Sequence, residues 1–82
     1  MFLLNMSTRE IVHVDHVPSG EWIQATFRVK RLINDHHDIE WEDVTIQGMI
    51  NIEDECLVLQ DRDSAFDIEY YTRGGGVLQW ES

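Results

Sequence analysis

The sequence predicts a mainly β fold, a small antiparallel meander of about six strands that forms a curled sheet or a small barrel. Three observations lead to this prediction. Two long segments alternate apolar and polar residues with a period of two, short polar turns separate the apolar runs, and no segment has the spacing of a long amphipathic helix. At most a short N-terminal helix is therefore expected, within residues 2–10.

A long central hairpin, formed by residues 21–33 and 39–52, is the strongest element of this prediction. Apolar residues of its two strands are expected to share one face of the sheet, and they are Ile23, Ala25, Phe27, Val29, Ile33, Val44, Ile46, Ile50 and Ile52. Gly48 falls within this apolar face, which indicates that another backbone passes close to it. On the polar face, Arg28 and Lys30 are expected to pair with Glu40 and Glu42 across the strands.

The end of the hairpin breaks this regular pattern. Ile39 and Trp41 have the opposite parity to the apolar residues that follow them in the strand. A parity shift of one residue is typical of a β-bulge, so we expect a bulge or a bend at residues 42–43.

Shorter strands are predicted on both sides of the hairpin. Residues 11–17 precede the Pro18-containing turn, and residues 56–60 follow the acidic turn 53–55. Phe66, Ile68 and Tyr70 alternate with polar residues, which predicts another strand, and residues 77–80 form the last. Gly74, Gly75 and Gly76 are expected to form the turn between these two strands.

The chain of 82 residues is expected to form a single domain. Residues 1–6 are either a flexible extension, with Met6 as an alternative start, or an added edge strand, or a segment that fills a partner's groove. The apolar run at residues 2–4 is too short for a signal peptide and no segment could span a membrane. Cys56 is the single cysteine, which favours a reducing, cytoplasmic location.

Charge is the strongest feature of the composition. Sixteen Asp and Glu residues face six Lys and Arg residues, which gives a formal net charge of −10. Such a surface repels phosphate backbones and anionic membranes, so direct nucleic-acid binding and membrane binding are not expected. The acidity either keeps the protein soluble, reflects adaptation to high salt, or attracts a basic protein surface.

Catalysis and a bound cofactor are not expected. Neighbouring acidic residues and burial both disfavour a Cys56 thiolate, and no serine or threonine lies in a recognisable nucleophile motif. The triple glycine could bind an anion through its N–H groups, but it lacks the lysine and helix of a phosphate loop. His13, His16, His36 and His37 could ligate zinc only if strand geometry were broken, because His13 and His16 point to opposite faces.

The function expected is that of a non-enzymatic, acidic protein-binding module, an inhibitor or regulator that engages a basic surface such as a nucleic-acid-binding one. Two alternatives remain, a small-molecule or metal-binding β-domain whose site lies at a homo-oligomer interface, and a structural subunit of an assembly such as a phage particle. The residues expected to bind the partner are Glu40, Glu42, Asp43, Glu53, Asp54 and Glu55, with Trp22 and Trp80 as aromatic anchors.

Overall fold

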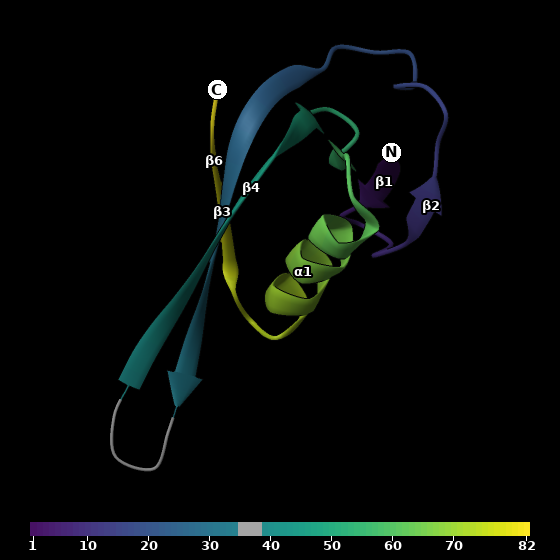
Figure 1. Ribbon diagram of the computed structural model, residues 1–82. Coiled ribbons are helices and arrows are strands. Elements are labelled where there is room, and N and C mark those ends of the chain that lie inside the picture. Colours follow the sequence, from purple (N-terminus) through teal and green to yellow (C-terminus); the bar gives the residue numbers. More distant parts are fainter. Residues whose placement is uncertain (35–38) are drawn as a thin grey trace.

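The computed structural model describes residues 1–34 and 39–82, and it describes side chains for residues 1–30 and 43–82. The predicted loop with His36 and His37 therefore lies outside the described residues. The elements in chain order are β1 (Phe2–Asn5), β2 (Ile11–His13), β3 (Ile23–Asn34), β4 (Ile39–Asn51), β5 (Cys56–Leu59), α1 (Arg62–Arg73) and β6 (Val77–Glu81) (Figure 1).

The six strands form one antiparallel sheet, which confirms the predicted fold class. Their order is β2-β1-β5-β4-β3-β6, so the sheet is open, with β2 and β6 at its edges, and it does not close into a barrel. Only part of this order is a meander, because β1 inserts between β2 and β5 and β6 returns to pair with β3.

The central hairpin is confirmed, and it extends well beyond the rest of the sheet in Figure 1. Every residue from Ile23 to Asn34 pairs with a single residue of β4, so the predicted bulge at residues 42–43 is wrong. The register between β3 and β4 stays constant through this segment.

The polar face of the hairpin pairs differently from the prediction. Arg28 lies opposite Thr45 and Lys30 lies opposite Asp43. Glu42 lies opposite Arg31 instead, and Glu40 is paired with an apolar residue, Ile33. Neither basic residue lies opposite Glu40 or Glu42, so the expected pairing is wrong.

Helix α1 replaces the strand that the sequence predicted around Phe66, Ile68 and Tyr70, and this is the largest correction to the fold. The sequence does contain signals for both ends of this helix. Asp61 is the N-cap and Asp63 lies in the first turn, while Arg73 lies in the last turn and Gly74 is the C-cap. Ala65 and Ile68 are three apart and both fully buried, so a helical face was present beneath the apparent alternation.

The N-terminal residues also differ from the expectation. Residues 2–5 form β1, which pairs with β2 on one side and β5 on the other, so this strand is not at the edge. Leu4 is fully buried in the core. The strand predicted at residues 11–17 is shorter and ends at His13.

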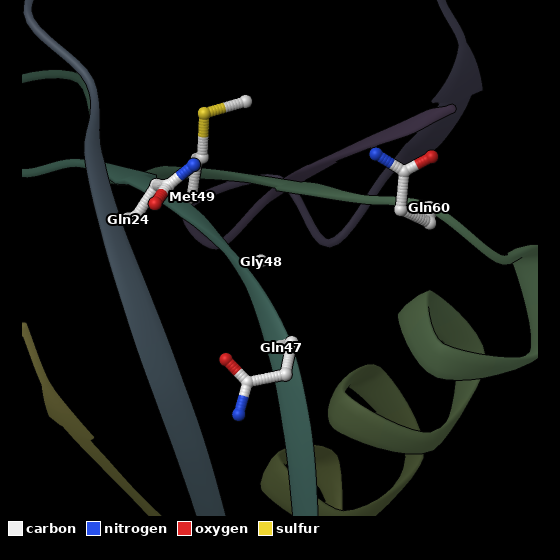
Figure 2. Close-up of a pocket in the computed structure, with 5 residues that line it drawn as sticks. All are labelled: Gln24, Gln47, Gly48, Met49 and Gln60. Carbon is white, nitrogen blue, oxygen red and sulfur yellow. The ribbon is translucent and has the colours of Figure 1, made fainter.

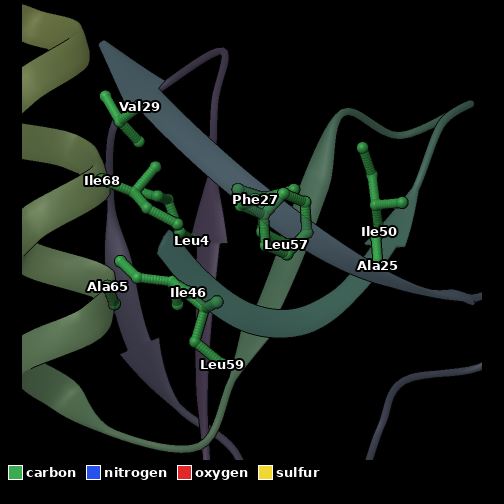
Figure 3. Packing of buried hydrophobic residues seen from close by; sticks show 10 residues of the cluster. All are labelled: Leu4, Ala25, Phe27, Val29, Ile46, Ile50, Leu57, Leu59, Ala65 and Ile68. Carbon is green, nitrogen blue, oxygen red and sulfur yellow. The ribbon is translucent and has the colours of Figure 1, made fainter. Parts of the chain in front are cut away.

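One face of the sheet and α1 enclose the hydrophobic core (Figure 3). Its buried residues are Leu4, Ala25, Phe27, Val29, Ile46, Ile50, Leu57, Leu59, Ala65 and Ile68. The close approach predicted at Gly48 is confirmed, because a Cβ atom there would lie 2.7 Å from the Val58 carbonyl oxygen and 2.9 Å from the Phe27 ring. Helix α1 lies at one side of the cluster in Figure 3, and Ile50 stands at the far side.

Candidate functional site

An apolar groove opens on the face of the sheet that carries the core. Its volume is about 390 Å³, and it is lined by Met6, Ile50, Ile52, Glu55, Leu57, Leu78 and Trp80. Ile50 and Leu57 also belong to the core, so the groove continues the apolar surface that α1 covers elsewhere. Ile52 is 55% exposed and Trp80 is 37% exposed, which leaves large apolar side chains open to a binding partner.

The sheet register explains how the groove forms. In β6, Leu78 lies opposite Val29 and Trp80 opposite Phe27, so both side chains point to the face that carries the core. On the other side of the groove, Ile50 of β4 pairs with Leu57 of β5. These strands therefore line the groove with side chains from parts of the sequence that lie far apart.

Carboxylates lie on the rim of the groove. Glu55 lines it directly, and its side chain accepts a hydrogen bond of 2.8 Å from the Ser7 hydroxyl. The backbone N–H of Met6 donates to the Glu55 carbonyl oxygen at 2.9 Å, which ties this turn to the segment after β1. Glu21 and Glu53 line a smaller hollow next to it, together with Ile23, Asn51 and Ile52.

The turn between β4 and β5 is held by a buried side chain. Asn51 is 3% exposed, its amide donates to the Asp54 carboxylate at 3.1 Å, and its side-chain oxygen accepts from the Asp54 N–H at 3.2 Å. These hydrogen bonds fix the direction of the acidic turn relative to the groove. Glu55 has a positive φ of 53°, which turns the chain sharply into β5.

Cys56 follows this turn and is buried, as the sequence predicted. Burial raises the pKa of the Cys56 thiol, and the charges of Asp54 and Glu55 raise it further. The thiol is therefore a poor nucleophile near neutral pH, and it contributes to packing.

Only some of the predicted partner-binding residues lie together. Trp80 and Glu55 share the groove, and Glu53 lines the hollow beside it. Asp43 lies eight residues before the end of β4, roughly 25–30 Å along the strand from the acidic turn at a rise of about 3.3 Å per residue, and its exposed side chain is on the opposite face of the sheet from the groove. Glu40 and Glu42 lie still nearer the hairpin end, so the structure separates the two halves of the predicted acidic cluster.

The two predicted tryptophan anchors also differ. Trp22 is half-buried, and its indole N–H donates to the Pro18 carbonyl oxygen at 2.7 Å within the turn that precedes β3. The indole N–H of Trp22 is therefore already bonded within the protein. Trp80 thus has the more accessible position for contact with a partner.

A second hollow lies on the opposite face of the sheet and is polar (Figure 2). Gln24, Gln47, Gly48, Met49 and Gln60 line it, with a volume of about 250 Å³. The Gln47 side-chain oxygen accepts a hydrogen bond of 3.1 Å from the Thr26 hydroxyl. The carboxamides offer donors and acceptors, but no charged side chain lines this hollow.

The described residues do not form the anion site or the metal site that the sequence left open. All three glycine N–H groups of residues 74–76 bond to carbonyl oxygens of α1, so they are not directed at an anion. His13 and His16 are exposed, and the His13 ring lies 5.2 Å from the Phe2 ring. Among the side chains described, no three His, Cys, Asp or Glu residues gather to hold a metal ion.

The groove residues missed from the sequence are Met6, Ile50, Ile52, Leu57 and Leu78. A signal existed for Ile52, because the predicted apolar face continues to this residue at the very edge of an acidic turn. The position of Met6 and Leu78 beside it depends on the strand order, which a single sequence does not give.

Comparisons with known proteins give no relative. No family model, no curated protein and no solved structure matches the chain. The helix in the described part of the chain is too short and too polar to cross a membrane.

Proposed function

We propose that this protein is a non-enzymatic, acidic binding module, an inhibitor or regulator that engages a basic surface of a partner protein. The observation that supports the proposal best is the position of Glu21, Glu53 and Glu55 around exposed apolar side chains on a chain of net charge −10. Carboxylates on the rim attract a basic partner from a distance, and apolar contacts supply the affinity once it arrives.

The partner surface would be of the kind that holds nucleic acid, because such surfaces concentrate Lys and Arg. An acidic protein that covers such a surface competes with the phosphate backbone. Interactions between exposed charges are screened by salt, so association with this partner should slow as the ionic strength rises.

The proposal is tested by a pull-down with tagged protein from host-cell lysate at low and high salt, followed by mass spectrometry. We expect a nucleic-acid-binding protein to be captured at low salt and released at high salt. No specific capture at either salt concentration, from a protein that remains folded, would contradict the proposal.

A matched pair of variants separates local from total charge. The triple variant Glu53→Gln, Asp54→Asn and Glu55→Gln should reduce capture more than the control variant Glu10→Gln, Asp15→Asn and Asp67→Asn. All six side chains are exposed, and each variant removes the same number of charges. Equal loss of capture in both variants would show that the acidic turn has no special role.

A further inference from the structure

The apolar face of the sheet continues past the helix that covers it. Ala65 and Ile68 of α1 are fully buried against one part of this face. Beyond them, Ile50 and Leu57 extend from the core into the groove, where Ile52 and Trp80 are exposed. An apolar sheet face is stabilised when another element packs against it, and none of the described elements covers this part of the face.

We propose that the groove docks a basic, amphipathic helix of a partner protein, which lies beside α1 on the same face of the sheet. This inference rests on the proposed function and specifies the partner's chemistry. A helix presents apolar side chains at positions i, i+3, i+4 and i+7 along one stripe, which suits a groove lined from several strands. An added strand would pair at the β2 or β6 edge and would leave the groove open.

Charge decides between a partner helix and a second copy of this chain. Glu21, Glu53 and Glu55 rim the apolar surface, and a twofold contact through the groove would bring these carboxylates close to their own copies. A net charge of −10 adds general repulsion between two copies. A helix with Lys or Arg flanking its apolar stripe meets the carboxylates with opposite charge and covers the rim with its aliphatic stems.

The first test is an NMR titration of the ¹⁵N-labelled protein. The probe is a leucine–lysine peptide of about 18 residues, roughly five helical turns, with leucines at i, i+3, i+4 and i+7. We expect the largest shifts at the Ile52 and Leu78 amides and at the Trp80 indole, and little change at Gln24 or Gln60. A scrambled peptide of the same composition should bind at least about tenfold more weakly, because it offers no apolar stripe.

Two matched variants separate apolar contact from charge. Ile52 and Val77 are 55% and 56% exposed, but only Ile52 lines the groove. Ile52→Asp adds a negative charge and removes apolar contact, so we expect the peptide's Kd to rise at least about tenfold. Val77→Asp adds the same charge outside the groove, and the Kd should stay within about twofold or fall.

Each other outcome overturns the inference in a recognisable way. Equal binding of the Ile52→Asp and Val77→Asp variants, or shifts centred on the polar hollow or on the outer part of the hairpin around Lys30 and Asp43, would reject the groove while leaving the acidic-module proposal to the pull-down. A free protein that sediments as a dimer and that Ile52→Asp converts to a monomer would identify a second copy as the occupant. Absence of any peptide binding at low salt would reject a basic amphipathic helix as the occupant of the groove.

Discussion

Gly48 should be intolerant of substitution because three neighbours occupy the space where a side chain would begin. A Cβ atom at this position would lie 2.6 Å from the Leu59 side chain, 2.7 Å from the Val58 carbonyl oxygen and 2.9 Å from the Phe27 ring. The Leu59 methyl group could rotate away, but the Val58 oxygen belongs to the backbone of β5. Gly48→Ala therefore forces β4 and β5 apart where they begin to pair.

The expected loss of stability follows from two opposing terms. Overpacking a core position costs about 1–3 kcal/mol, and the backbone contact places Gly48→Ala at the upper end of this range. Alanine also restricts the unfolded chain, which returns about 0.4–1 kcal/mol. The net loss is about 2 kcal/mol, and for a chain of this size each kcal/mol lowers Tm by about 4–8 °C.

Thermal unfolding followed by circular dichroism, with urea unfolding as a second measure, tests this expectation. Gln47→Ala is the control, because Gln47 is the exposed neighbour on the opposite face and its loss should cost less than about 0.5 kcal/mol. A Gly48→Ala protein with unchanged or higher Tm would refute the close packing of β4 against β5 at this point.

Three further predictions address the core, the buried thiol and the tryptophans. Phe27→Ala removes a fully buried ring and should cost about 3–5 kcal/mol in urea unfolding, enough to leave a domain of this size barely folded. Because the pKa of Cys56 is higher in the folded state than in the unfolded state, its contribution to stability is fully present below the unfolded pKa and is lost as pH rises through the folded one. Urea unfolding should therefore show stability falling more steeply above about pH 9 in the native protein than in Cys56→Ser. The indole proton of Trp22, bonded to the Pro18 oxygen, should exchange with solvent more slowly in NMR spectra than that of Trp80; equal rates would contradict the turn geometry.

The sequence was most informative where one local pattern dominates. Alternation over a dozen residues predicted both strands of the hairpin, and a glycine within the apolar face predicted the close approach at Gly48. Cys56 was correctly placed in the core, because the residues around it form a short apolar run. These features depend on neighbours in the chain or on the adjacent strand.

Features that depend on distant parts of the chain were not predicted. Phe66 and Tyr70, which produce the apparent alternation, are exposed in α1, whereas its buried face is formed by Ala65 and Ile68. The insertion of β1 between β2 and β5, and the return of β6 to β3, have no signal in a single sequence. The groove could not be predicted for the same reason, because Met6, Leu57 and Trp80 come from three separate strands or their flanks.

The separation of the acidic residues makes one more expectation testable with the same peptide. Asp43 lies roughly 25–30 Å from the end of β4 by the strand rise of about 3.3 Å per residue, and its side chain is on the opposite face of the sheet from the groove. The Debye length at physiological ionic strength is about 8 Å, and the sheet lies between the Asp43 carboxylate and the groove, so a peptide in the groove should respond to Asp43 less than to the rim. Asp43→Asn should leave the peptide's Kd within about twofold, and Glu53→Gln with Glu55→Gln should raise it several-fold and flatten its salt dependence. If Asp43→Asn weakened binding as much as the rim variant, the peptide would have to contact the polar face of the hairpin, and a single docking position in the groove would be excluded.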